Sequence, residues 1–168
     1  MKEFRLAPMS PLIRGLTIGL LVLPVIFLAA AYAFPSGRWG VSPLFAPAVF
    51  LVAIYAWIWL GFRPTRFVVK PDAIDVIWPL KRRTIARSSI AEARLVDRAE
   101  LRRKVGWGAR VGAGGLWGGF GWLWTQKRGI VQMYVSRTDR FVWLERGSER
   151  AWLITPEEPE AFVRALGR

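Results

Sequence analysis

The chain has 168 residues, a hydrophobic fraction of 53% and a formal net charge of +13 at pH 7. It contains no cysteine and no histidine, which excludes disulfides, thiolate metal sites and the commonest general base. Residues 63–168 carry 21 Lys and Arg against 11 Asp and Glu. A surface this basic is typical of proteins that meet polyanions, either nucleic acid or anionic phospholipid.

Two uncharged apolar stretches, residues 15–34 and 41–62, predict a pair of membrane-spanning helices. They contain 20 and 22 consecutive residues without a charged side chain. At about 1.5 Å per residue, each helix is long enough to cross a hydrocarbon core of about 30 Å. Only residues 35–40 separate the stretches, so residues 1–62 are expected to form an N-terminal tail and a helical hairpin.

Basic residues flank the outer ends of this predicted hairpin. They are Lys2, Arg5 and Arg14 before it and Arg63, Arg66, Lys70, Lys81 and Arg82 after it. The connecting turn contains only Arg38. Because cytoplasmic segments are enriched in Lys and Arg, we predict a multi-pass protein of the inner (cytoplasmic) membrane with both termini in the cytoplasm.

A cleaved signal peptide is the alternative interpretation of the first stretch. A basic start and an apolar run lead to the Ala-x-Ala pattern at residues 31–33. The apolar run is longer than a usual signal core, however, and a second stretch follows almost at once. Cleavage would also leave the basic domain on the less favoured side of the membrane.

From residue 65 onward, short β-rich runs separated by turn residues predict an all-β domain over residues 63–168. The predicted strands are 66–70, 73–78, 82–86, 90–97, 130–136, 141–145 and 150–154. Their short and even spacing favours an antiparallel sandwich or barrel. Thr155 is a predicted N-cap with Pro156 at the first helical position, and Phe162 and Leu166 share one face of the helix that follows. This helix is expected to cap the open end of the barrel.

The order of strands followed by one closing helix resembles pleckstrin-homology (PH) domains. The strand pair around Phe67 to Trp78, the run 83–90 and the ending 152–162, placed after two apolar stretches, resemble bacterial PH-like membrane proteins. The resemblance implies a membrane α-helical hairpin plus an all-β PH-like barrel of about seven antiparallel strands with a C-terminal capping α-helix. It covers residues 63–166, departs at an insertion over 98–128, and implies a binding or assembly module without catalytic residues.

The insertion is rich in glycine, tryptophan and basic residues. Eight glycines fall within residues 106–121, interleaved with Trp107 and Trp117, and Trp122 and Trp124 follow. A phosphate-cradling loop is disfavoured because neither a P-loop nor a complete G-x-G-x-x-G pattern is present. Two interpretations remain: an interfacial loop with tryptophans at head-group depth, or a structural segment in which Trp122 and Trp124 fill the core. We expect Trp107 and Trp117 to be more exposed than Trp122 and Trp124.

Candidate contact residues come from this insertion, and no catalytic, cofactor or metal site is predicted. The residues predicted to contact lipid or a partner are Arg102, Arg103, Lys104, Trp107, Arg110, Trp117, Lys127 and Arg128. Nucleic acid is disfavoured as a partner because the chain has no recognition motif for it and has a predicted bilayer anchor. The acidic residues fit turns, strands and the first turn of the last helix, so we do not expect an enzyme.

The sequence therefore predicts a membrane-anchored, non-catalytic PH-like binding module that contacts anionic lipid head groups or an acidic protein partner. The alternative is an assembly or structural subunit of a membrane protein complex or homo-oligomer. The GxxxG pattern at Gly15 and Gly19 and any unpaired barrel edge motivate this alternative.

Overall fold

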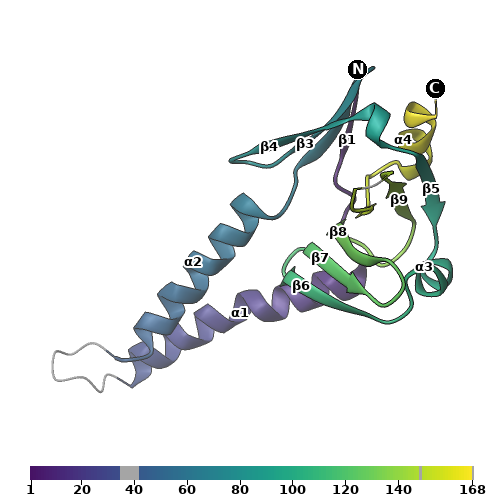
Figure 1. Cartoon of the computed structure of the whole chain (residues 1–168). Coiled ribbons are helices and arrows are strands. Elements are labelled where there is room, and N and C mark those ends of the chain that lie inside the picture. The colour runs from purple at the N-terminus through teal and green to yellow at the C-terminus, as the bar shows by residue number, and fades with distance from the viewer. Residues whose placement is uncertain (35–41, 148, 168) are drawn as a thin grey trace.

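The computed structural model describes residues 1–34, 42–147 and 149–167. It consists of an apolar helical hairpin that projects from a β-rich domain (Figure 1). The hairpin helices are α1 (Pro11–Ala33) and α2 (Phe45–Gly61). Within the described residues the domain has ten strands in two sheets, three more than the sequence predicted.

The first sheet has four strands in the order β1-β2-β3-β4, all antiparallel. Its strands are β1 (Lys2–Arg5), β2 (Arg66–Val69), β3 (Ala73–Ile77) and β4 (Arg82–Ala86). The short helix η1 (Arg87–Ser89) leads from β4 to the second sheet.

The second sheet has six strands in the order β5-β9-β10-β8-β7-β6, and only the β10–β8 pair is parallel. Its strands are β5 (Glu92–Val96), β6 (Gly108–Gly114), β7 (Gly119–Thr125), β8 (Gly129–Val135), β9 (Phe141–Glu145) and β10 (Trp152–Ile154). Two helices accompany it, α3 (Arg98–Val105) and α4 (Pro159–Leu166).

Each face of the second sheet is covered over part of its area. One face packs against the first sheet and α4, around the fully buried rings of Phe67, Phe120 and Phe162. The other face packs against α3, where Val105 joins a cluster that contains the fully buried Trp143. The strand alternation of inward and outward side chains produces these two separate cores.

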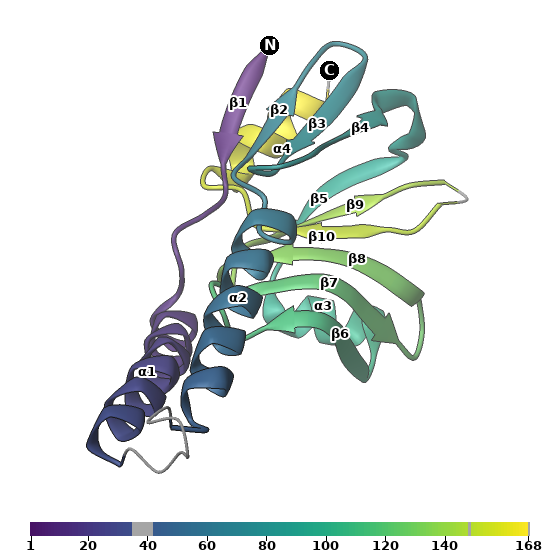
Figure 2. The ribbon, with the colours of Figure 1, turned by 90° about the vertical axis from the view of Figure 1, so that its left-hand side faces the viewer.

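Strand β1 is the main feature that the sequence analysis missed. It precedes the hairpin but pairs with β2, which follows the hairpin, in the register Lys2↔Val69 to Arg5↔Arg66. The Phe4 ring is 7% exposed and meets the Phe162 ring edge-on, with centroids 5.2 Å apart. The chain therefore enters and leaves the hairpin from neighbouring strands of one sheet (Figure 2).

The start of the last helix was predicted wrongly. Helix α4 begins at Pro159 after Glu158, three residues later than an N-cap at Thr155 implied. Thr155 is fully buried, and its Oγ1 accepts a hydrogen bond of 2.9 Å from the backbone N–H of Ser136. The hydroxyl therefore links strand ends and does not cap a helix.

The predicted insertion is folded and not a loop. Residues 98–128 form α3, β6 and β7, which were not expected as regular elements. Helix α3 begins after Asp97, whose side chain accepts the Glu100 backbone N–H at 2.7 Å, a capping interaction. The Asp97-Arg-Ala-Glu100 pattern is a signal that would have predicted this helix.

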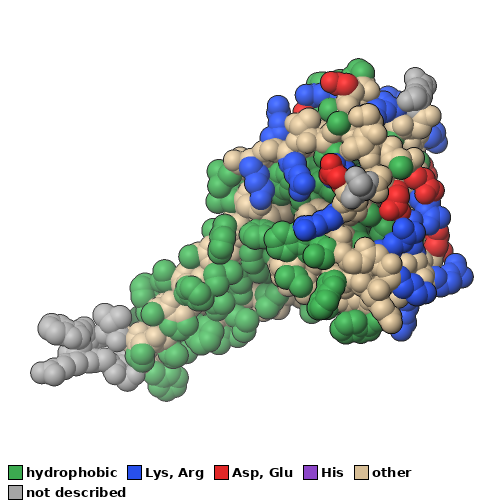
Figure 3. All heavy atoms as spheres, in the orientation of Figure 1, with side chains coloured by type: hydrophobic (Ala, Val, Ile, Leu, Met, Phe, Trp, Pro, Cys, Tyr) green, Lys and Arg blue, Asp and Glu red, His purple; other side chains and the backbone are tan. Residues whose placement is uncertain are grey.

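The sequence predicted two spanning helices, and one helix of the described structure qualifies as a candidate span. Helix α1 is long and apolar enough to cross a membrane, whereas α2 is apolar but has 17 residues. The two helices pack together, with Ala48 fully buried and the Tyr55 hydroxyl donating to the Leu20 carbonyl at 2.9 Å. Apolar side chains cover the visible surface of this hairpin (Figure 3).

Truncating Phe4 tests whether β1 belongs to the folded domain. We expect Phe4→Ala to destabilise the full chain by about 3–5 kcal/mol, because it opens a cavity beside Phe162. Denaturant unfolding in detergent measures this loss, with Leu80→Ala as the control because Leu80 is 73% exposed. Equal stability of the Phe4→Ala chain and the wild-type chain would show that β1 does not contribute to the core.

The buried, paired carboxylate of Asp75 should make the stability of the fold depend on pH in the acidic range. Its buried carboxylate is 2.7 Å from Lys70 Nζ and accepts a 2.7 Å hydrogen bond from Thr84 Oγ1. These bonds hold the pKa of Asp75 below its ordinary value, so the carboxylate stabilises the fold above its unfolded pKa. That contribution is lost as the pH falls through the folded pKa.

We therefore expect Asp75→Asn to lose roughly 1–3 kcal/mol at neutral pH, because a buried charged hydrogen-bond acceptor is removed. The difference in stability between the variant and the wild type should begin to shrink below about pH 4, the pKa of Asp in an unfolded chain, and should be lost once the pH is below the folded pKa. Unfolding curves across this pH range measure the effect, and the exposed Asp72→Asn serves as the control. A constant difference at all pH values would contradict the assignment.

Candidate functional site

Aromatic and basic side chains meet where α2 joins the domain. The Trp78 indole N–H donates to the Phe62 carbonyl at 3.0 Å. Lys81 Nζ lies over the rings of Phe62 and Trp78, and the Arg63 guanidinium lies 4.3 Å from the centroid of the Trp59 ring. Rings of this kind with adjacent cations are typical of the membrane–water interface.

The tip of the β6–β7 hairpin docks on both helices. Thr17, on α1 and 3% exposed, accepts a 2.9 Å hydrogen bond from the Trp117 backbone N–H. The Trp117 ring packs edge-on against Trp59 of α2, with centroids 4.8 Å apart. Trp117 has a φ of 57°, a left-handed conformation that non-glycine residues rarely adopt. The helices and the second sheet are therefore joined at this tip.

The expected order of tryptophan exposure is correct for Trp107 and wrong for Trp117. Trp107 is 75% exposed, more than Trp122 at 41% or Trp124 at 63%, whereas Trp117 is half-buried against the helices. Trp122 and Trp124 also do not fill the core; Phe120, on the same strand face, is the fully buried residue. The first sheet covers Phe120 and leaves the two tryptophans beyond it open to solvent.

Six of the eight predicted contact residues lie together at the far end of the β6–β7 hairpin. We name this group the α3 cluster: Arg102, Arg103, Lys104, Trp107, Lys127 and Arg128. Lys127 Nζ donates to the Arg103 carbonyl at 3.2 Å, and Gln126 N–H donates to the Trp107 carbonyl at 2.9 Å. These bonds join the turn between β7 and β8 to the end of α3.

Lys104 and Arg128 share one acidic partner within this cluster. Their nitrogens lie 3.4 Å and 3.7 Å from the Glu145 carboxylate. Burial lowers the pKa of Lys104, and Glu145 opposes that change. Arg102, Arg103 and Lys127 are exposed, so they carry the charge that the cluster offers to a partner. Arg110 lies on β6 opposite Leu123, and Trp117 lies at the other end of the β6–β7 hairpin.

A basic pocket of about 470 Å³ lies beside the turn between β2 and β3. Lys2, Lys70, Arg87 and Arg164 line it without an acidic side chain. Two of these cations have partners, since Lys70 pairs with Asp75 and Arg87 donates to the Leu166 carbonyl at 2.7 Å. Strand β2 leads away from the hairpin toward this turn, so the pocket is remote from the apolar helices.

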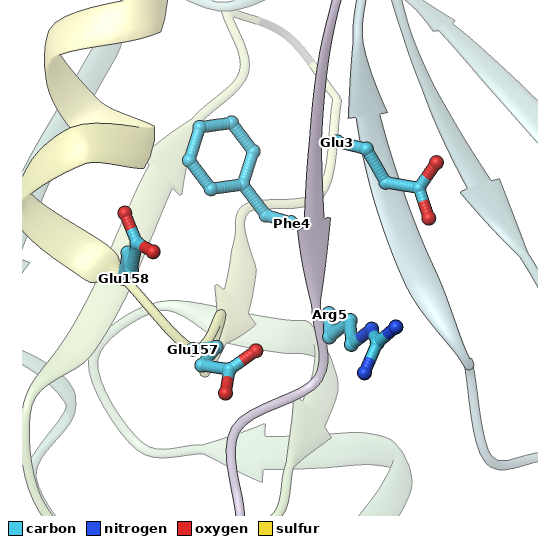
Figure 4. A pocket seen from close by; sticks show the side chains of 5 residues that line it. All are labelled: Glu3, Phe4, Arg5, Glu157 and Glu158. Atoms are coloured by element: carbon cyan, nitrogen blue, oxygen red, sulfur yellow. The ribbon is translucent and has the colours of Figure 1, made fainter.

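A second pocket, between β1 and the start of α4, is acidic (Figure 4). Glu3, Glu157 and Glu158 line it with Arg5 as the single cation. In Figure 4 the Phe4 ring points toward α4, whereas the side chains of Glu3 and Arg5 lie on the other side of β1. This pocket is unsuited to an anionic ligand. Among the described residues, no group of three or more His, Cys, Asp or Glu is placed to hold a metal ion.

The family of bacterial PH domains matches residues 65–168, and the chain belongs to that family. No curated protein and no solved structure matches the chain. The matched region begins after the hairpin and leaves out β1, which completes the first sheet here. PH-like domains are generally non-catalytic binding modules, which agrees with the expected function class.

Thr17→Val tests the junction between the hairpin and the second sheet. The variant keeps the side-chain shape but leaves the Trp117 N–H without its acceptor, so we expect amide exchange at residues 114–118 to quicken about tenfold. Hydrogen exchange of the full chain in detergent measures this, and Thr17→Ser, which keeps the hydroxyl, should exchange like the wild type. Unchanged exchange in Thr17→Val would show that the tip is held by other contacts.

Proposed function

We propose that this member of the bacterial PH domain family is a membrane-anchored, non-catalytic binding module that contacts anionic lipid head groups. One observation carries the proposal: β1 and β2 flank the apolar hairpin and pair with each other. The domain is thereby held at the base of helices whose large side chains, among them Ile18, Val25 and Phe50, are exposed. A lipid phase is the natural environment for such side chains.

We further propose that both helices enter the inner membrane and that both termini lie in the cytoplasm. The basic residues on the outer flanks of the hairpin support this orientation. Helix α2, though shorter, ends in Trp57, Trp59 and Phe62, residues typical of an interface. A cleaved signal peptide fits poorly, because cleavage after Ala33 would remove both β1 and Thr17 from the fold.

Two basic surfaces are proposed to meet the head groups. Arg63 and Lys81 lie at the base of the hairpin, next to interfacial rings. The exposed cations of the α3 cluster lie at the other end of the β6–β7 hairpin. Each Lys or Arg near an anionic leaflet contributes about 1 kcal/mol of attraction.

Lipid retention by the full chain tests this function, since a chain starting at Arg63 would lack β1. We expect the purified protein to retain phosphatidylglycerol in preference to phosphatidylcholine in native mass spectra. The double variant Arg102→Glu, Arg103→Glu should lose most of that preference, because two attractive charges become repulsive. The double variant Lys2→Glu, Arg164→Glu, in the remote pocket, is the matched control because it changes the net charge by the same amount.

No preference in the wild type, or an equal loss in the control variant, would contradict lipid contact at these surfaces. The same spectra count protein copies and so address the alternative, an assembly subunit. Gly15 and Gly19 favour that alternative. No atom lies within 4 Å of the position that a Cβ would occupy at either glycine, so the two glycines do not pack α1 on α2 and are free to contact another protein. Monomers alone at all concentrations would exclude self-assembly.

A further inference from the structure

A groove of about 450 Å³ lies in the mouth between the two sheets, apart from the α3 cluster and from the hairpin. Arg83 of β4 forms one side of this groove, and Trp122 and Trp152 of the second sheet form the other. Arg146 and Arg150, from the connection between β9 and β10, line its end. Figure 2 shows β4 on one side of the mouth and the strands of the second sheet fanning out on the other.

Positive charge in this groove exceeds negative charge. Arg83 and Arg146 lie over the same Trp152 ring, at 5.1 Å and 5.6 Å from its centroid. Among the described residues, Glu149 is the single acidic residue that lines the groove, and its carboxylate is 2.6 Å from the Arg146 guanidinium. The Arg146 side chain is 6% exposed, and burial, together with the nearby Arg83, lowers its pKa. The groove is therefore built to attract carboxylates.

Strand β4 offers an unpaired backbone edge beside this charge. In the described structure it is the last strand of its sheet, paired with β3 alone. Trp78 N–H donates to the Lys81 carbonyl and Arg87 N–H donates to the Asp72 carbonyl, at the two ends of the β3–β4 pair. Since hydrogen-bonded pairs alternate along an antiparallel ladder, Arg83 and Ile85 bond toward β3. The backbone groups of Arg82 and Thr84 and the N–H of Ala86 consequently face outward, whereas the Ala86 carbonyl accepts a 2.7 Å hydrogen bond from Ser89 Oγ.

We propose that the mouth groove binds an extended acidic segment of a partner protein, which pairs with the edge of β4 as an additional strand. Backbone groups at Arg82 and Thr84 and the N–H of Ala86 supply the hydrogen bonds. Acidic side chains at alternate positions of the segment point inward to Arg83 and Arg150, as the period of two in a strand requires. The Glu149 carboxylate on Arg146 shows the kind of ion pair that the segment would make.

A peptide suits this site better than a lipid does. An outward row of N–H and C=O groups is complemented by another backbone, which a head group with acyl chains does not supply. Trp122 on one side of the groove and β4 on the other also leave room for the side chains of an added strand, which point alternately to its two faces. The proposal goes beyond lipid contact, because it assigns a protein partner to a surface that does not include the α3 cluster.

The test uses the full chain in nanodiscs of neutral phosphatidylcholine and a fluorescent ten-residue peptide of alternating glutamate and valine. We expect saturable binding by anisotropy that Arg150→Gln weakens about tenfold, because one charge-assisted hydrogen bond is lost. Arg150 is exposed, so this variant should unfold like the wild type. Arg102→Gln in the α3 cluster is the matched control and should bind within twofold of the wild type.

Amide exchange and peptide N-methylation distinguish strand addition from binding by charge alone. Peptide binding should slow amide exchange at Arg82, Thr84 and Ala86 and leave Arg83 and Ile85, already bonded to β3, unchanged. A peptide N-methylated at every second residue, on the edge that faces β4, keeps all carboxylates but should bind at least about tenfold more weakly.

Three results would overturn the proposal. They are no binding of the peptide, equal binding of the N-methylated peptide, and displacement by phosphatidylglycerol vesicles without any protection of the β4 amides, which would assign the groove to lipid. Because the nanodiscs are neutral, failure here leaves the lipid-retention experiment independent, and failure of lipid retention leaves this one standing.

Discussion

The pairing of β1 with β2 is the contact on which the rest of the molecule depends. Adjacent strands lie about 4.8 Å apart, so this pairing holds together the two points where the chain enters and leaves the apolar hairpin. Phe4 of β1 packs in the core beside Phe162. Thr17 of α1 accepts a hydrogen bond from the Trp117 backbone N–H. Phe4 and Thr17, both near the N-terminal end of the chain, thus connect the first sheet, the apolar hairpin and the second sheet.

Strand direction separates the basic residues into distinct surfaces. Strand β2 begins beside the hairpin, so the turn after it, with Lys70, lies at the remote end, and the turn after β3, with Lys81, returns to the hairpin base. The α3 cluster forms because β6 and β7 carry the chain away from their tip at Thr17. The excess of positive charge is thus divided between the base of the hairpin, the α3 cluster and the arginines of the mouth groove.

Periodicity and turn residues predicted the parts of the fold that depend on local sequence. The strands of the C-terminal domain other than β6 and β7, and the PH resemblance, were predicted from such signals, and the family match confirms the resemblance. Strand β1 was missed because four residues carry no detectable period, and its pairing spans the whole hairpin. The burial of Trp117 depends on Trp59 and Thr17, distant in sequence. The mouth groove likewise combines Arg83 with Arg146, which only tertiary structure brings together.

Strand β1 also imposes an order on biosynthesis. It leaves the ribosome first, but its partner β2 is made only after both apolar helices. Because proteins fold as segments emerge, the first sheet must wait until the hairpin has been synthesised, and closing the sheet then fixes the hairpin ends together. A folded first sheet therefore indicates that synthesis of the hairpin is complete, and a chain halted at α1 would still carry β1 without its partner strand.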